Sequence, residues 1–176
     1  LRGAVARTVY TTNAAVIPAT IIKVLDLNAR SLAIGTSCCA GMDAIGHAVR
    51  MIALGEAEIA ICGGTDAPLF RTPLVELRAA GLTPATAENP HKLNRPFDLW
   101  RTTGVVSEGG CMIVVEPESS PRKGYSFITG YSFANDVGVD SATGMAVAMK
   151  YALADAGVRP DNVDTISAWG PGHGQT

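Results

Sequence analysis

Short apolar runs alternate along this chain with longer segments in which apolar residues recur at helical spacing. The runs are bounded by Gly, Pro, Asn or Asp, which is the pattern of buried strands. They predict strands over residues 31–37, 58–62, 111–116, 125–133 and 163–168. The segments with helical spacing predict helices over 12–25, 40–54 and 74–80, and a further helix that follows the loop 135–140 and ends at Ala156. Strands that alternate with helices in this way favour an α/β layered fold.

Cys38 lies where a predicted strand turns directly into a predicted helix. The strand ends at Ser37, and the apolar helix pattern begins at Met42, after Cys38-Cys39-Ala40-Gly41. Unpaired backbone N–H groups and the positive end of the helix dipole stabilise a thiolate at such a turn. The same N–H groups can hold an oxyanion. Because small cysteines are also common in protein cores, the residues alone leave a nucleophilic and a packing role open.

Composition limits the classes of protein to consider. Hydrophobic residues make up 47% of the chain and charged residues only 17%, with a mean hydropathy of +0.21. Such an apolar chain is expected to bury surface in a further part of the fold or in a subunit interface. The formal net charge of −2 does not favour nucleic acid as a partner. Charges and turn residues interrupt every long apolar run, so no membrane span is expected.

The four cysteines do not form the pattern of a disulfide framework. Cys38 and Cys39 are adjacent, and Cys62 and Cys111 fall in predicted core strands. The start of the chain also lacks the order of a signal peptide. Together these features favour a reducing compartment and a cytoplasmic location. Adjacent cysteines without a histidine cluster do not have the spacing of metal ligands, and no metal site is expected.

Other polar and small residues have simpler interpretations. Asn13 is expected to cap the first helix. Asp43, His47 and Arg50 share one stripe of the helix after Cys38, which is interpreted as facing solvent or an interface, with a polar network under an active site as the alternative. The pairs Gly63-Gly64 and Gly109-Gly110 are interpreted as sites of tight packing, because no Gly-Lys-Ser/Thr follows them.

Several motifs together resemble one known family. They are Thr36-Ser-Cys-Cys-Ala-Gly41, Ile45-Gly-His47, Cys62-Gly-Gly64, Arg95-Pro-Phe-Asp98, Glu108-Gly109, Met112-Ile-Val-Val-Glu116 and Tyr151-Ala-Leu-Ala-Asp-Ala-Gly157. Their order and spacing resemble those of the β-ketoacyl-[acyl-carrier-protein] synthases, condensing enzymes of the thiolase superfamily. The resemblance runs from about Asn13 to the C-terminus. The family enzymes are far longer, so the chain is identified as a divergent, central fragment of such an enzyme.

The resemblance implies a thiolase-like layered αβαβα fold, in which two similar halves pack about a buried helix. Residues 1–116 would be the end of the N-terminal half with the nucleophile turn, and residues 117–176 the start of an incomplete C-terminal half. Cys38 takes the place of the family nucleophile, and Cys39 that of a small packing residue. The family's second catalytic histidine and its lysine would lie beyond Thr176.

Two acidic positions in the family pattern are implied to be structural. Asp98 and Glu108 match residues that hold loops near the family's pocket. Arg95 and Arg101 are the candidate partners of these two carboxylates.

The resemblance also implies a reaction and its partners. An acyl chain would pass from the phosphopantetheine of an acyl carrier protein to Cys38, and the carbanion formed by decarboxylation of a malonyl unit would then attack the cysteinyl thioester. No bound cofactor is expected, because the phosphopantetheine belongs to the carrier protein. A homodimer, or a heterodimer with another synthase subunit, is expected. Fatty-acid and polyketide synthesis are the two settings that the family suggests.

Trp169 departs from the family pattern. The family motif Asn-Ala-His-Gly-Thr reads here as Ser167-Ala168-Trp169-Gly170-Pro171. An indole N–H can donate a hydrogen bond but cannot accept a proton. His173, four residues on and flanked by glycines, is the alternative donor. Two functions therefore stay open: an acyltransferase that uses Cys38, and a catalytically impaired partner subunit like a chain-length factor. A thiolase-type enzyme for coenzyme A thioesters is ranked last.

Overall fold

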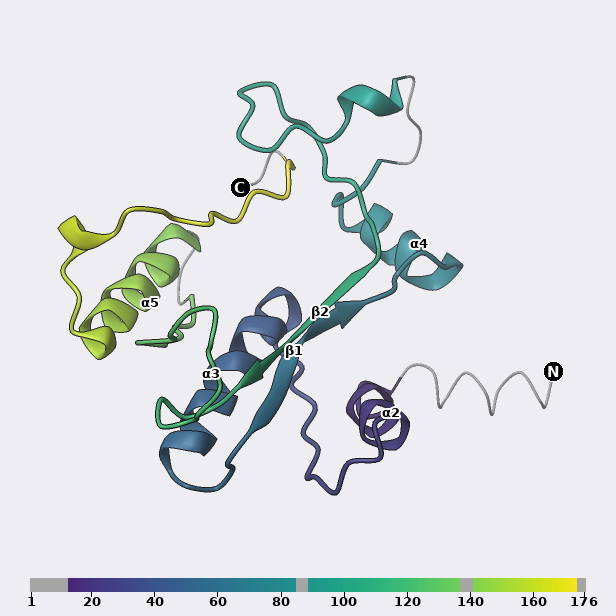
Figure 1. Cartoon of the computed structure of the whole chain (residues 1–176). Helices are drawn as coiled ribbons and strands as arrows, with labels where there is room; N and C mark the ends of the chain where they lie inside the picture. The colour runs from purple at the N-terminus through teal and green to yellow at the C-terminus, as the bar shows by residue number, and fades with distance from the viewer. Residues whose placement is uncertain (1–12, 85–88, 137–140, 174–176) are drawn as a thin grey trace. The chain divides into compact units, whose positions relative to one another are not determined.

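The computed structural model describes residues 13–84, 89–136 and 141–173 of the chain. In chain order its helices are α2 (Val16–Val24), α3 (Ala40–Ala53), α4 (Arg71–Ala79) and α5 (Ser141–Ala156), its strands β1 (Ala60–Asp66) and β2 (Gly109–Val115), and its short 3₁₀ helices η1 (Ser37–Cys39), η2 (Pro90–Lys92) and η3 (Pro160–Asn162) (Figure 1).

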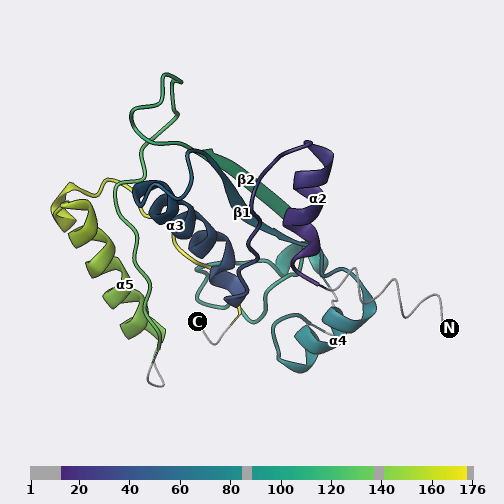
Figure 2. The ribbon, with the colours of Figure 1, turned by 90° about the horizontal axis from the view of Figure 1, so that it is seen from below.

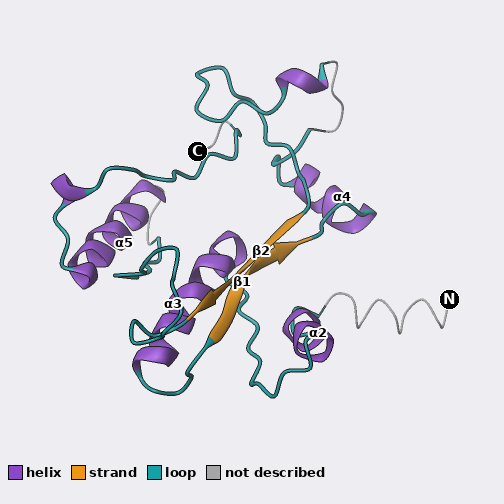
Figure 3. Ribbon diagram, in the orientation of Figure 1, coloured by secondary structure: helices purple, strands orange, loops and turns teal. Residues whose placement is uncertain are grey.

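The chain divides into two compact units, each of which is described by itself. One comprises Leu1–Gly64 and Met112–Tyr125, and the other Thr65–Cys111 and Ser126–Thr176. β1 and β2 pair in a two-stranded sheet and run in opposite directions (Figure 3). The domain boundary expected at residue 116 concerns the longer family fold and stays a prediction.

In the first unit, α3 lies alongside β1 (Figures 1 and 2). The two elements approach closely because both carry glycine at the contact: a Cβ built on Gly64 would lie 3.1 Å from the Cα of Gly41. Cys62, in the part of β1 that belongs to this unit, is buried, and so is Ala48 of α3. The start of α3 is therefore held against the strand.

In the second unit, the segment before α5 runs along that helix. Gly130 lies so near that an added Cβ would overlap the carbonyl oxygen of Ala152. The backbone N–H of Tyr131 donates to the carboxylate of Asp155 at 2.9 Å. Glycine is thus required where the segment crosses α5, and an acidic side chain of the helix anchors it.

The helices were predicted better than the strands. All four regular helices fall at predicted positions, whereas residues 31–37, 125–133 and 163–168 form no regular strand in the described structure. Strands need partner strands for their ladder of hydrogen bonds, and the described sheet consists of β1 and β2 alone. Regular α2 begins at Val16, and Asn13 caps the turn that leads into it: its side chain accepts from the Ala15 N–H at 2.9 Å and its carbonyl from the Val16 N–H at 3.0 Å.

Large apolar side chains stay exposed in both units. Leu54 at the end of α3, Val75 of α4 and Met149 of α5 are examples. Among the described residues, the buried hydrophobic side chains are Ala48 and Cys62. This agrees with the expectation, drawn from composition, that the chain buries further apolar surface against another part of a protein.

Candidate active-site residues

Cys38 is exposed in a tight turn directly before α3. Ser37, which precedes it, has a φ of 57° in the left-handed region that residues with a side chain rarely adopt. The chain then makes one turn of 3₁₀ helix and continues as the 14-residue α3 from Ala40. Cys38 therefore stands at the sharp entry to a helix N-terminus, as the sequence predicts.

Two backbone hydrogen bonds close this turn. The N–H of Cys39 donates to the carbonyl of Thr36 at 3.3 Å, and the N–H of Ala40 donates to the carbonyl of Ser37. Neither bond uses the N–H of Cys38. Backbone N–H groups at such a position are the kind of donor that stabilises the oxyanion of an acyl-transfer intermediate.

A side-chain hydrogen bond spans the same turn. The hydroxyl of Thr36 donates to the carboxylate of Asp43, in the first turn of α3. Asp43 is half-buried, whereas His47 and Arg50 are exposed. The stripe predicted to face solvent or an interface is thus confirmed as exposed for His47 and Arg50, but Asp43 has a specific partner that helical spacing did not predict.

The other thiols differ from Cys38 in place and exposure. All four cysteines are free, and burial raises the pKa of the Cys62 thiol in β1. Cys111 is exposed in β2. Cys39 is exposed as well among the described residues and is the N-cap residue of α3, so its role as a packing residue in the longer family fold stays a prediction.

Trp169 and His173 lie together in the second unit. Their ring centroids are 5.9 Å apart and their planes meet at 76°, an edge-to-face arrangement. Gly172, between them, has a φ of 84°, which allows the chain to turn back on itself. Trp169 is 51% exposed and His173 is half-buried. The structure therefore brings the two predicted candidates of this segment into contact, while Cys38 belongs to the other unit.

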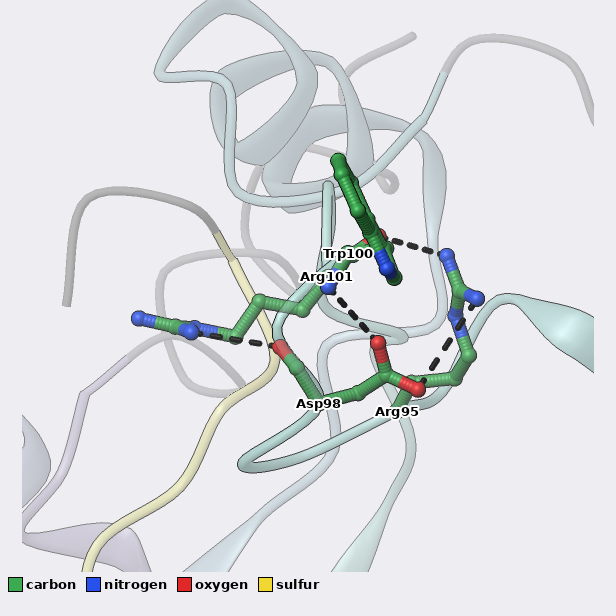
Figure 4. A network of polar contacts seen from close by, with 4 residues as sticks. All are labelled: Arg95, Asp98, Trp100 and Arg101. Atoms are coloured by element: carbon green, nitrogen blue, oxygen red, sulfur yellow. Dashed lines mark hydrogen bonds and ion pairs between the residues drawn. The ribbon is translucent and has the colours of Figure 1, made fainter.

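The loop from Arg95 to Arg101 carries a network of polar contacts (Figure 4). Arg95 donates to the carbonyl of Trp100 at 2.5 Å and lies 3.9 Å from the carboxylate of Asp98. The carboxylate of Asp98 also accepts from the backbone N–H of Trp100 at 2.7 Å, and the guanidinium of Arg101 donates to the backbone carbonyl of Asp98. The predicted pairing of Arg95 with Asp98 is confirmed. Glu108 instead accepts from the backbone N–H of Leu69 at 3.1 Å.

This loop and the residues just after it pack against the segment that carries Trp169 and His173. A Cβ on Gly170 would overlap the ring of Phe97, and one on Gly104 would lie 2.8 Å from the carbonyl of Pro171. Phe97 itself has a φ of 63°, an outlier for a bulky residue. Sequence reasoning assigned no role to Phe97 or Gly170, although the glycines around His173 were a visible signal.

No group of three or more potential metal ligands gathers among the residues that the structure describes. Within the same residues, no helix combines the length and the apolar character needed to cross a membrane.

Comparison with known proteins decides the family. Residues 2–120 match the model of the β-ketoacyl synthase N-terminal domain. The chain belongs to the β-ketoacyl synthase family. It is 35% identical to 3-oxoacyl-[acyl-carrier-protein] synthase 2 of Coxiella burnetii over 156 residues, which cover 82% of this chain and 37% of that enzyme. The recognition made from the motifs is thereby confirmed.

Solved structures agree. The ketosynthase AntDE, determined in complex with the acyl-carrier protein of its type II polyketide synthase, superposes with a TM-score of 0.81 at 28% identity, over 92% of this chain and 42% of that one. The ishigamide ketosynthase/chain length factor gives 0.80 at 29% identity, over 93% and 41%. The thiolase-like α/β fold is thereby confirmed. This chain spans about two fifths of the length of these ketosynthase-family proteins.

Proposed function

We propose that the protein is a β-ketoacyl-[acyl-carrier-protein] synthase-type acyltransferase in which Cys38 accepts the acyl chain. The observation that carries the proposal is the geometry of the turn: an exposed thiol directly before α3, after a residue with a left-handed φ, in the family's nucleophile motif. No other cysteine combines exposure with the first position of that motif.

The first step would be a transthioesterification. The Cys38 thiolate attacks the carbonyl carbon of the acyl thioester on phosphopantetheine, the new S–C bond forms, and the pantetheine S–C bond breaks. The departing thiolate takes up a proton, which balances the proton that Cys38 lost. Backbone N–H groups of the turn, including that of Cys38, are the candidate donors to the tetrahedral oxyanion.

The second step would be decarboxylative condensation. A malonyl thioester loses carbon dioxide, and its α-carbon attacks the Cys38 thioester, which releases the Cys38 thiolate and forms the β-ketoacyl product. This step needs hydrogen-bond donors on the malonyl thioester carbonyl. Trp169 and His173 are the proposed donors of this chain: the indole N–H donates only, whereas the imidazole can also exchange a proton.

An acyl carrier protein and a second synthase subunit are the proposed partners. The relatives support this: one solved ketosynthase is bound to its acyl-carrier protein, and another is a ketosynthase/chain length factor. The exposed apolar residues of the described units are in keeping with a subunit interface. The phosphopantetheine arrives with the carrier protein, so no resident cofactor is part of the proposal.

Trp169 favours a second candidate function, that of an impaired partner subunit. It occupies the family's histidine position, and an indole is bulkier than an imidazole and cannot accept a proton. Losing one such donor typically lowers the rate by about 10²–10³. In this candidate function, the protein would shape the pocket of an active synthase rather than condense substrates itself.

A pulse–chase experiment on the full-length protein separates the two candidates. The protein is first loaded from acyl-carrier protein that carries a labelled acyl chain, and unlabelled malonyl-carrier protein is then added. A synthase loads the label and transfers it to a β-ketoacyl product. An impaired partner retains the label or never acquires it. Cys38→Ala is the control and should abolish loading.

The variant Trp169→His then tests the role of the indole. If tryptophan impairs condensation, the variant should release carbon dioxide from malonyl-carrier protein faster than the wild type. A wild-type rate typical of the family, together with a slower Trp169→His variant, would show instead that Trp169 or His173 is a working catalytic group.

A further inference from the structure

We propose that Thr36 and Asp43 are positioning residues for the Cys38 thiol, and that their hydrogen bond clamps the turn which presents it. The inference rests on the proposed function, because it assigns these residues a role in acyl transfer to Cys38. Thr36 lies two residues before Cys38 and Asp43 five residues after it, so the bond spans the whole 3₁₀ turn.

Thr36 holds the turn in two ways. Its carbonyl accepts from the N–H of Cys39 at 3.3 Å, and its hydroxyl donates to the Asp43 carboxylate. The first bond fixes the backbone around Cys38, and the second fastens the incoming chain to α3. Both bonds depend on the path that the chain takes through Ser37, whose φ is 57°.

That path needs support from its surroundings. A residue other than glycine in the left-handed region is strained and persists only where neighbouring structure imposes it. Among the described residues, Cys38 and Cys39 are exposed and a Cβ added to Gly35 would meet nothing within 4 Å, so the hydrogen bonds of the turn are the contacts of this chain that hold it. The hydrogen bond to an ionised carboxylate is therefore the natural source of the constraint, because charge-assisted bonds are about twice as strong as neutral ones.

The surroundings of Asp43 fit a positioning role better than a place in a stripe that faces solvent. Its carboxylate lies in the first turn of α3, where a negative charge stabilises the helix N-terminus. It is half-buried, while His47, one turn further on, is exposed. The clamp would keep the start of α3 and the Cys38 thiol in one fixed arrangement, which is what directed attack on a thioester requires.

The experiment compares two reactions of Cys38 in the full-length protein. Acylation is measured with the hexanoyl thioester of N-acetylcysteamine, and alkylation with iodoacetamide, with peptide mass spectrometry reporting each cysteine separately. Exposed Cys111 is the internal reference. The variants are Thr36→Val, which removes the hydroxyl, Thr36→Ser, which restores it, and Asp43→Asn, which keeps the shape and removes the charge. Thr20→Val is the matched control, because Thr20 also donates its hydroxyl to a nearby acceptor, the carbonyl of Val16, at 2.7 Å within the same unit.

A positioning role predicts a split between the two reactions. Thr36→Val should slow acylation of Cys38 about tenfold, in line with the loss of one hydrogen bond to a charged group, and alkylation by less, while Cys111 and the Thr20→Val variant are unchanged. Thr36→Ser should recover most of the rate. Asp43→Asn should slow acylation of Cys38 at least about threefold. If Thr36→Val fails to fold, the acylation rate of Asp43→Asn alone tests the clamp.

Each remaining outcome counts against a specific claim. If wild-type Cys38 alkylates but is never acylated, the proposed function fails, and the clamp is then judged on alkylation of Cys38 relative to Cys111. If neither Thr36→Val nor Asp43→Asn changes the Cys38 rates, or if Thr36→Ser behaves like Thr36→Val, the clamp is overturned. Equal loss of reactivity at Cys38 and Cys111 would likewise overturn it, because a general structural defect would explain that result.

Discussion

Gly64 and Gly41 make one contact between β1 and α3, yet alanine at the two positions should have opposite effects. A Cβ on Gly64 would lie 3.1 Å from the Cα of Gly41, whereas a Cβ on Gly41 would lie 3.5 Å from the Cα of Gly64. Favourable carbon–carbon contacts begin near 3.5 Å. Gly64→Ala must therefore push backbone against backbone by a few tenths of an ångström, and Gly41→Ala need not.

The expected magnitudes follow from this difference. Overpacking typically costs about 1–3 kcal/mol, so Gly64→Ala should lower the free energy of unfolding by roughly that amount, less a gain of about 0.4–1 kcal/mol from the stiffer unfolded chain. Gly41 is the second residue of α3, where alanine gains at most the about 0.8–1 kcal/mol by which it is favoured over glycine in a helix interior, so Gly41→Ala should be neutral or stabilising. Because Gly41 lies three residues after Cys38, Gly64→Ala should also slow acylation of Cys38.

Urea unfolding and acylation kinetics of the full-length variants measure both effects. Gly35→Ala is the control, since a Cβ there meets nothing within 4 Å. A stabilising Gly64→Ala, or equal destabilisation by Gly64→Ala and Gly41→Ala, would refute the reasoning from this contact.

Three further predictions concern titration, thiol accessibility and assembly. A hydrogen bond from Ser120 and the contact with Arg122 hold the pKa of Glu116 below its ordinary value, against an opposing effect of desolvation. Glu116 should therefore stabilise the protein fully above the pKa that its carboxyl has in the unfolded chain, and this stabilisation should be lost as the pH falls through the lower pKa of the folded state. Glu116→Gln should thus flatten the decline of the melting temperature below about pH 4. Cys62 should be the slowest of the four thiols to react with iodoacetamide in the native protein and should match the others after unfolding; fast native labelling would contradict its burial. The full-length protein should sediment as a dimer or larger, and a monomer at every concentration would mean that no subunit interface covers its exposed apolar residues.

Local features of the chain were predictable from sequence. The turn at Cys38 follows from an apolar run that stops at two small residues before a helical pattern, and the structure has the turn and α3 in those places. The helices could also be predicted, because the hydrogen bonds of a helix and the spacing of its apolar residues lie within one segment of the chain. The family motifs then identified the nucleophile position, which no periodicity could have done.

Contacts outside the regular helices were not predictable. Residues 163–168 have a strand pattern, but a strand exists only where a partner supplies the ladder. Helical spacing put Asp43 on a stripe with His47, whereas its partner Thr36 lies across the turn. The approach of Trp169 to His173 depends on the left-handed φ of Gly172, which a glycine permits but does not dictate.

The site of the acyl group in the loaded full-length protein tests the central claim most directly. Incubation with acyl-carrier protein that bears a labelled acyl chain, followed by proteolysis and tandem mass spectrometry, reports which of the four cysteines carries the thioester. The account predicts stoichiometric label on Cys38, with Cys39, Cys62 and Cys111 unmodified. Label on any of those three, or no thioester at all from a competent carrier protein, would contradict it.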